Sequence, residues 1–173
     1  RWLSSDAVLE CKVPGRWGNA HPTIVPYQSF QTADSYLVIG VASEGIWRRF
    51  CQAIGKTELA DDPRFAKNAE RVENRTLLIA MLRKLFRSRD NEHWLKLLNE
   101  AEVPCAPIQT IDQVFAAPQV RHRDMLVEVQ HPTVGTVRMA GIPVKFSATP
   151  ASVRLPPPLL GEHTDEILRE LER

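Results

Sequence analysis

Residues 15–40 read GRWGNAHPTIVPYQSFQTADSYLVIG, and this stretch decides how the rest of the chain is organised. Its first part is unsuited to helix or strand, because it is interrupted at Gly15, Gly18, Pro22 and Pro26. Two runs with strand character follow at 24–32 and 36–41, and the Asp and Ser between them favour a tight turn. The stretch therefore predicts a polar loop that leads into a β-hairpin.

The loop before the hairpin is a candidate functional segment, because binding residues are often carried by loops on a rigid scaffold. His21 is the one of the five histidines that lies in it. Two interpretations stay open for this side chain. It is a structural loop histidine, which is the more frequent case, or it contacts a substrate.

Composition excludes several classes of protein. The 173 residues are 43% hydrophobic and 25% charged, which is ordinary globular usage and is enough for one domain with its own core. Lys and Arg total 22 against 21 Asp and Glu, so the charge predicts neither a nucleic-acid partner nor a membrane surface. No apolar run reaches the roughly 18 residues of a membrane span.

The cysteines predict neither a disulfide framework nor a metal site. Cys11, Cys51 and Cys105 are odd in number and far apart, and no metal-ligand spacing occurs. We expect reduced thiols and a location in the cytoplasm, or in the mitochondrial matrix if the source is eukaryotic.

The middle of the chain shows helical periodicity. A first helix is expected after Ser43 as its cap, a longer one at 69–86, and a third after Asp90. The expected core faces are Trp47, Phe50, Cys51 and Ile54 in the first, Leu78, Met81, Leu82 and Leu85 in the second, and Trp94, Leu97 and Leu98 in the third. Arg75 is expected on the outer face of the second helix.

The C-terminal third predicts mixed structure. Residues 103–107 favour an extended connector or edge strand, 110–113 fit a capping box, and Pro118 begins a short helix. Strands are expected at 126–129 and 136–146, the second interrupted by Gly141 and Pro143. A Pro-rich arm at 147–158 precedes a helix at 162–171, with Ile167, Leu168 and Leu171 inward. The fold class is α+β: an N-terminal β-hairpin, a helical middle, a C-terminal antiparallel strand pair, a Pro-rich arm and a terminal helix.

Catalytic signals outside the loop are weak. Cys105 lies between two prolines and could be a nucleophile, but it has no local base, so an inert thiol is the favoured interpretation. Arg121, His122 and Arg123 could hold a phosphate or simply form a solvated helix end. Glu44 fits a carboxylate that is favoured by a helix N-terminus.

Five segments together resemble the class III CoA-transferases, the CaiB/BaiF family. They occur in this order, from about Gly15 onward: GRWGNAHPTIVPYQSFQT, IGVASEGIWRRFCQAIG, LADDPRFAKNAERVENR, VPCAPI and PPPLLGEHTDEILREL. The last segment is the most specific of the five, and VPCAPI supports it.

The resemblance implies an enzyme that moves CoA between an acyl-CoA and a free carboxylic acid. A family Asp would attack the acyl-CoA, giving first a mixed anhydride and then an aspartyl-CoA thioester. No cofactor would be bound permanently, and the CoA thioester would be a substrate. The intact protein would combine a large CoA-binding domain with a small domain and form an interlocked homodimer.

The same resemblance implies that this chain is the small domain and a C-terminal segment only. The chain begins at Arg1, and we expect the missing large domain upstream. Residues 1–14 would be a linker, 15–146 the small α+β domain, and 147–173 an arm and helix that pack on the large domain. The nucleophile would also lie upstream, so no catalytic role falls to Asp6, Asp34, Asp61, Asp62, Asp90, Asp112, Asp124 or Asp165. We assign no metal ligand, and the sequence does not identify cofactor-binding residues.

One family feature can be carried over to the N-terminal loop. In formyl-CoA transferase, the corresponding glycine-rich loop covers the active site. The corresponding substrate-side residues are Gly18, Asn19, Ala20, His21, Pro22 and Thr23, although His-Pro-Thr replaces the family's glycines.

Two alternative functions stay open. The parent could be an α-methylacyl-CoA racemase in which Glu44 takes part in proton abstraction, or the chain could be a non-catalytic module that dimerises through its arm and final helix.

Overall fold

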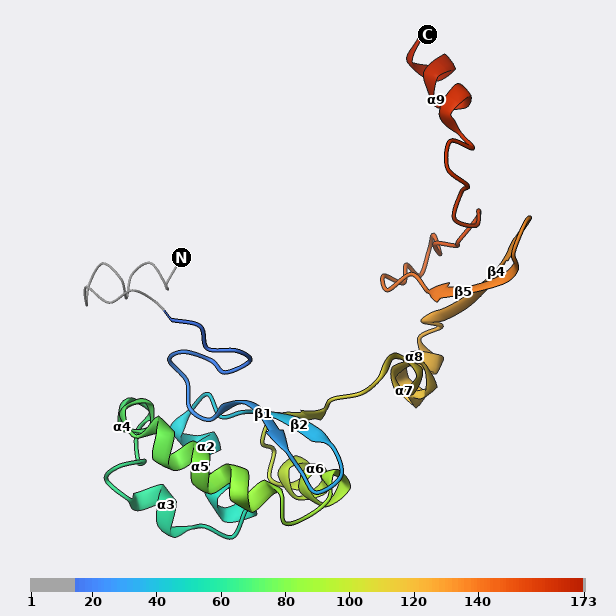
Figure 1. The fold of residues 1–173 in the computed structure, drawn as a ribbon. Coiled ribbons are helices and arrows are strands. Elements are labelled where there is room, and N and C mark those ends of the chain that lie inside the picture. Colours follow the sequence, from blue (N-terminus) through green and yellow to red (C-terminus); the bar gives the residue numbers. More distant parts are fainter. Residues whose placement is uncertain (1–14, 173) are drawn as a thin grey trace. The chain divides into compact units, whose positions relative to one another are not determined.

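The structure is a computed structural model, and it describes residues 15–172. Backbone contacts divide the chain after Ile108 into two compact units (Figure 1). This division differs from the expected boundary after Phe146, because the second unit joins the pair α7–α8 and the pair β4–β5 to the residues that follow. The expected linker at 1–14 lies outside the described residues, and the proposed domain of 15–146 stays a prediction.

The first unit contains a three-stranded antiparallel sheet in the order β1-β2-β3. The strands are β1 (Tyr27–Gln31), β2 (Tyr36–Gly40) and β3 (Cys105–Pro107). The predicted hairpin and edge strand are confirmed, although the hairpin strands are shorter than expected. Pro26 has no N–H to donate, so β1 begins after it. At the turn, the Thr32 hydroxyl accepts from Ser35 N–H and donates to the Asp34 carboxylate.

Five helices complete the first unit. They are α2 (Glu44–Ala53), α3 (Glu58–Asp61), α4 (Asn68–Glu73), α5 (Arg75–Phe86) and α6 (Asn91–Glu100). The predicted caps are confirmed, since Ser43 accepts from Ile46 N–H and Asp90 accepts from His93 N–H. Gly55, with a φ of 66°, follows α2 in the left-handed conformation that commonly ends helices.

The prediction of one continuous helix at 69–86 is wrong. Asn74 separates α4 from α5, and its side-chain amide donates to the carbonyls of Arg64 and Glu70. Such side-chain bonds compete with helix continuation. The buried face of α5 consists of Leu78, Ile79, Leu82 and Phe86. The expected core position of Met81 is therefore wrong, since its side chain is 39% exposed.

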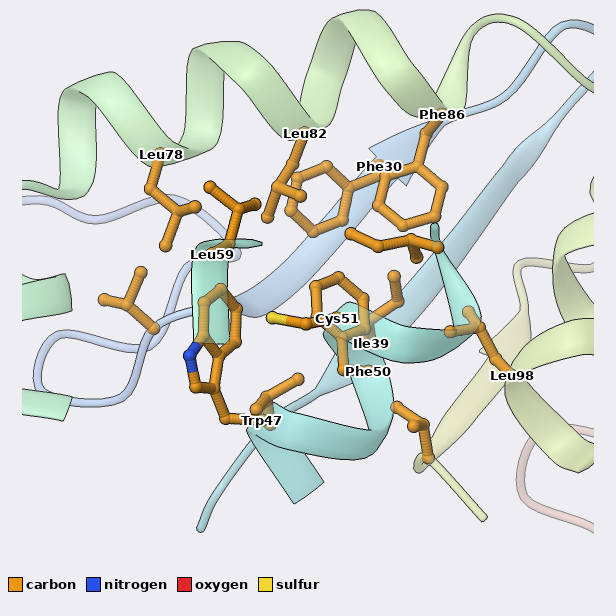
Figure 2. Packing of buried hydrophobic residues seen from close by; sticks show 14 of the residues in the cluster. Phe30, Ile39, Trp47, Phe50, Cys51, Leu59, Leu78, Leu82, Phe86 and Leu98 are labelled. Atoms are coloured by element: carbon orange, nitrogen blue, oxygen red, sulfur yellow. The ribbon is translucent and has the colours of Figure 1, made fainter. Parts of the chain in front are cut away.

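The hydrophobic core lies between α5 on one side and α2 on the other (Figure 2). Leu78, Leu82 and Phe86 point from α5 toward Trp47, Phe50 and Cys51 from α2. Phe86 also contacts Phe30 and Trp94, each with ring centroids 5.0 Å apart. The indole N–H of Trp94 donates to the carbonyl of Phe86 at 2.8 Å. The hairpin, α5 and α6 are therefore joined at Phe86 through two aromatic contacts.

The second unit is organised around a strand pair. It contains α7 (Ile111–Ala116), α8 (Pro118–His122), β4 (Leu126–His131), β5 (Gly135–Ala140) and α9 (Thr164–Leu171). The capping box at Thr110 and Gln113 is confirmed. Strand β5 ends at Ala140, earlier than predicted. Gly141 follows, and its backbone lies so close to the Asp124 carbonyl that a side chain would have no room.

The prediction that α9 turns its apolar residues inward is wrong for the described residues. Ile167, Leu168 and Leu171 are 54%, 53% and 78% exposed. An amphipathic helix hides its apolar face only when another element covers it. Among residues 109–172 no element does so, and every hydrophobic side chain in the buried core comes from residues 25–103.

Neighbouring residues on α5 test the corrected helical phase. We expect Leu82→Ala to lower the free energy of unfolding by about 2–5 kcal/mol, because it leaves a cavity in the core. Met81→Ala on the same helix should cost less than about 1 kcal/mol, because the side chain is partly exposed. Urea unfolding followed by circular dichroism measures both variants. Equal losses would contradict the phase.

Candidate functional site

The candidate loop has a defined conformation in the structure. Gly18 has a φ of 61°, in the left-handed region that glycine tolerates best, and Ala20 N–H donates to the Trp17 carbonyl at 3.1 Å. The side-chain oxygen of Asn19 accepts from Ser29 N–H at 3.1 Å. Asn19 therefore connects the loop to strand β1.

His21 makes several contacts inside the loop. Its backbone N–H donates to the Tyr27 carbonyl at 2.9 Å, and its ring stacks on the Tyr27 ring with centroids 5.4 Å apart. Its Nδ1 accepts from Thr23 N–H at 3.2 Å. These contacts give His21 a structural role, while contact with substrate stays a prediction.

Arg75 holds the loop from the first turn of α5. Its guanidinium donates to the carbonyls of His21 and Pro22 at 2.9 and 2.6 Å, and it lies 4.7 Å from the centre of the Trp17 ring. Partial burial lowers the pKa of Arg75 below its ordinary value. The expectation that Arg75 faces outward is wrong, because the break at Asn74 lets α5 begin against the loop.

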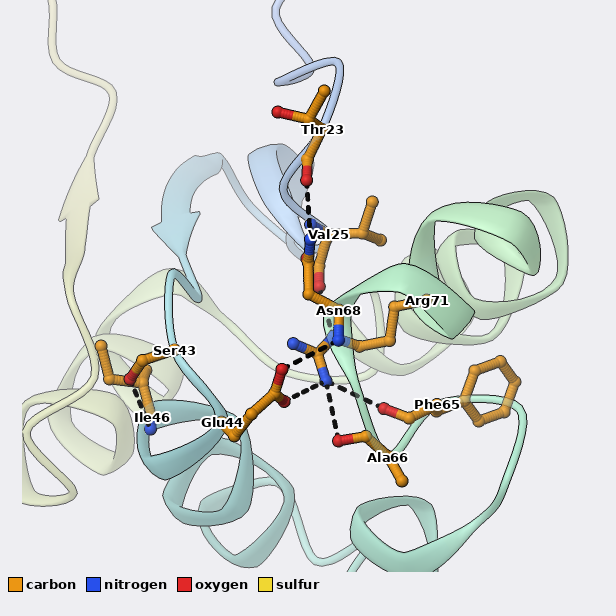
Figure 3. A network of polar contacts seen from close by, with 9 residues as sticks. All are labelled: Thr23, Val25, Ser43, Glu44, Ile46, Phe65, Ala66, Asn68 and Arg71. Carbon is orange, nitrogen blue, oxygen red and sulfur yellow. Dashed lines mark hydrogen bonds and ion pairs between the residues drawn. The ribbon is translucent and has the colours of Figure 1, made fainter.

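A buried arginine holds the end of the loop (Figure 3). Arg71 is fully buried, and its Nε donates to the Val25 carbonyl at 2.7 Å. Its Nη1 donates to the Phe65 carbonyl at 2.9 Å and to the Glu44 carboxylate at 2.8 Å. The guanidinium also lies 4.7 Å from the centre of the Trp47 ring, a favourable cation–π distance.

Asn68, at the start of α4, adds three hydrogen bonds to this network (Figure 3). Its side chain accepts from Val25 N–H at 3.1 Å and donates to the Thr23 carbonyl at 2.7 Å. Its own N–H donates to the second oxygen of Glu44 at 2.9 Å. Sequence reasoning did not find Asn68 or Arg71. The sequence signal for them was the polar segment KNAERVENR before α5, because its helical part, α4, turns Arg71 toward the core.

The network gives Glu44 a structural role. Partial burial raises the pKa of its carboxyl, but the hydrogen bonds from Arg71 and Asn68 N–H and the charges of Arg71 and Arg48 outweigh this and leave the pKa below its ordinary value. A carboxylate with both oxygens bonded and a lowered pKa is a weak proton acceptor. This geometry disfavours the racemase role that the sequence left open for Glu44.

The remaining candidate groups have ordinary surroundings. Burial raises the pKa of the Cys105 thiol, whose sulfur lies 3.6 Å from Asn99 Oδ1, and it raises the pKa of Cys51 to about 12. Both thiols are therefore poor nucleophiles near neutral pH. Arg121, His122 and Arg123 lie exposed at the end of α8.

Two kinds of feature are absent from residues 15–172. No helix there is both long and apolar enough to cross a membrane. The same residues contain no group of three or more His, Cys, Asp or Glu side chains that could hold a metal ion.

Comparison with known proteins assigns the family. The model of CoA-transferase family III matches residues 2–164. The chain belongs to this family. Human succinyl-CoA:glutarate CoA-transferase is 39% identical over 171 residues, which are 99% of this chain and 39% of that protein. Haloarcula marismortui succinyl-CoA:mesaconate CoA-transferase is 37% identical over 91% of this chain and 39% of its own.

Solved structures agree with this assignment. A CaiB/BaiF family protein from Brucella suis superposes with a TM-score of 0.73 at 34% identity, covering 98% of this chain and 43% of that one. The α+β fold is therefore shared with the family. The chain spans about two fifths of the length of the relatives that it matches.

Removal of the buried guanidinium should be far more harmful than removal of the charge on its partner. We expect Arg71→Met to lower the free energy of unfolding by about 3–5 kcal/mol, because the carbonyls of Val25, Phe65 and Ala66 lose their donor and Glu44 loses its cation. Glu44→Gln should cost about 1 kcal/mol or less, because the Glu44 side chain is 49% exposed. Urea unfolding measures both, and an equally mild Arg71→Met would contradict the role of Arg71.

The lowered pKa of Glu44 also predicts a pH dependence. The carboxylate contributes stability that is fully present above its ordinary pKa of 4.5 and is lost as the pH falls through the lower pKa of the folded state. We therefore expect the stability difference between the wild type and Glu44→Gln to shrink as the pH falls below the ordinary pKa of 4.5. A difference that stays constant below this pH would contradict the ion pair.

Proposed function

We propose that this chain is the small-domain part of a longer enzyme that moves CoA from an acyl-CoA to a free carboxylic acid. The observation that carries the proposal is the family match over residues 2–164, joined to relatives of which the chain spans about two fifths. The relatives' names describe transfer between CoA thioesters and dicarboxylic acids: succinate, glutarate and mesaconate. A dicarboxylic acid is accordingly the proposed class of acceptor.

The proposed reaction passes through an aspartate outside this chain. That carboxylate attacks the thioester carbonyl and releases CoA thiolate, which leaves a mixed anhydride. The thiolate attacks the aspartyl carbonyl and releases the donor acid. The acceptor carboxylate then displaces the thiolate from the aspartyl thioester, and attack of the thiolate on the acceptor acyl group restores the aspartate.

In this proposal the present chain shapes the acceptor side of the cleft. The loop residues Gly18 to Thr23 are suited to that role because Arg75, Asn68 and Asn19 fix their backbone from outside the loop or at its start. A loop that is held before substrate arrives loses less conformational entropy on binding. The proposal also includes a homodimer, packing of α9 on the CoA-binding part, and a cytoplasmic or mitochondrial location.

A transfer assay tests whether the catalytic aspartate lies outside this chain. The purified 173-residue chain, given succinyl-CoA and glutarate, should form no glutaryl-CoA by liquid chromatography and mass spectrometry. The longer protein that carries this chain should form a new CoA thioester with a dicarboxylic acid. Turnover by the chain alone would contradict the external nucleophile. Failure of the longer protein with every dicarboxylic acid tried would favour the non-catalytic module.

Two glycines with the same backbone conformation test the loop. Gly18 and Gly55 have φ values of 61° and 66°, and an added Cβ would meet nothing within 4 Å at either position. Alanine at each should cost about 1–2 kcal/mol of backbone strain. In the longer protein we expect Gly18→Ala to lower kcat/KM by about fivefold or more, because the strain shifts the loop. Gly55→Ala should lower stability and leave kcat/KM nearly unchanged.

Equal kcat/KM values for the two alanine variants would contradict a role of the loop in turnover. Thermal unfolding of both variants provides the control, because the two substitutions should destabilise the fold by similar amounts.

A further inference from the structure

A groove runs along α5 where the helix faces the N-terminal loop and strand β1. One recess of about 310 Å³ is bordered by Trp17 and Arg75, and a second of about 230 Å³ is bordered by Asn19 and Arg87. Arg83 lines both recesses, so they are adjacent. We call the two recesses together the α5 groove.

The positive charge of the α5 groove is not compensated by any acidic residue that lines it. Arg75 donates to backbone carbonyls, and Arg87 donates to the neutral side chain of Gln31 at 2.9 Å. Arg83 has no hydrogen bond or ion pair with any residue from 15 to 172. Neither recess has an Asp or Glu among its lining residues.

Other arginines of the same unit are arranged differently. Arg48, Arg64 and Arg71 each form an ion pair with a carboxylate: Asp61, Asp62 and Glu44, respectively. Arg49 donates to the carbonyls of Ala101 and Glu102 instead, as Arg75 does to those of His21 and Pro22. The α5 groove is distinguished by three arginines around adjacent recesses that no carboxylate lines. Concave surfaces with charge of one sign focus the electric field and concentrate counter-ions.

We propose that the α5 groove binds an anionic carboxylate or phosphate group, with Arg83 as its main contact. Arg83 and Arg87 are one helical turn apart, so their guanidinium groups lie on the same side of α5. Each guanidinium offers a planar pair of donors that matches a carboxylate or a phosphate. Gln31 orients Arg87 before the ligand arrives.

The second recess adds neutral donors to this pair. Tyr36 lines it, is 48% exposed, and carries a hydroxyl that can donate a hydrogen bond. Asn19 also lines it, and because its oxygen accepts from Ser29 N–H, its amide nitrogen can donate to a ligand. Charged and neutral donors around one hollow are typical of sites for oxyanions.

Two sources could supply the anion, and the choice of probes rests on the proposed function. A dicarboxylic acid carries a carboxylate that does not react, and CoA carries phosphates on its adenosine. Glutarate and adenosine 3′,5′-bisphosphate are therefore the two probes. Each is titrated at low salt into the isotope-labelled 173-residue chain and followed by NMR, because screening by salt weakens exposed charge interactions.

The expected result is saturable binding of at least one probe, with shifts concentrated at residues 17–36 and 75–87. Arg83→Gln should weaken that binding about tenfold or more, as expected for loss of a charged hydrogen bond. Lys84→Gln is the matched control, because it removes the same charge from the next residue of α5 and does not line the groove. It should change binding less than about twofold. Circular dichroism verifies that both variants fold.

Each outcome decides the inference. Preference for glutarate assigns the groove to a carboxylate, and preference for the bisphosphate assigns it to the phosphates of CoA. Absence of binding by both probes, or equal weakening by Arg83→Gln and Lys84→Gln, would overturn the groove as a site. CoA transfer by the longer protein is measured separately. The anion site can therefore be refuted while the proposed function is supported, and the proposed function can be refuted while the anion site is supported.

Discussion

The buried guanidinium of Arg71 is the constraint on which the first unit depends. A charge removed from water is costly unless its donors are bonded, and breaking such an arrangement leaves polar groups stranded. Arg71 meets most of this requirement, because its Nε and Nη1 join Val25 at the end of the loop, Phe65 before α4, and Glu44 on α2. Its buried Nη2 has no hydrogen-bond partner among the described residues. The Trp47 ring covers its face. The loop conformation is therefore linked to the placement of two helices and cannot change alone.

The break between α4 and α5 at Asn74 allows two arginines to bond the backbone of one loop. In a continuous helix Arg71 and Arg75 would lie one turn apart on a single face. Because the chain turns at Asn74, Arg71 is buried beneath Val25 while Arg75 bonds the carbonyls of His21 and Pro22. The same change of direction places the rest of α5 along the loop and β1, where Arg83 and Arg87 line the groove.

Local chemistry made part of this structure predictable. The caps at Ser43 and Asp90 and the hairpin follow from hydrogen bonds within a few residues, so the sequence indicates them directly. The break at Asn74 depends on bonds to the carbonyls of Arg64 and Glu70. Within α5, two overlapping apolar faces fit the sequence, one with Met81 and one with Ile79, and only tertiary packing selects the second. Arg71 was missed for a related reason. A charged residue is normally exposed, and only the tertiary arrangement of carbonyls around it makes burial tolerable.

The two units obtain their stability in different ways. The first has a core of aromatic and aliphatic side chains, whereas the hydrophobic side chains of residues 109–172 remain partly or fully exposed. A two-stranded pair such as β4–β5 is marginal in water without a covered face. Exposed apolar groups such as Leu168 gain free energy when another surface covers them. The exposed apolar face of α9 is therefore consistent with the proposal that another surface covers it in a longer protein, and this argument is independent of family resemblance.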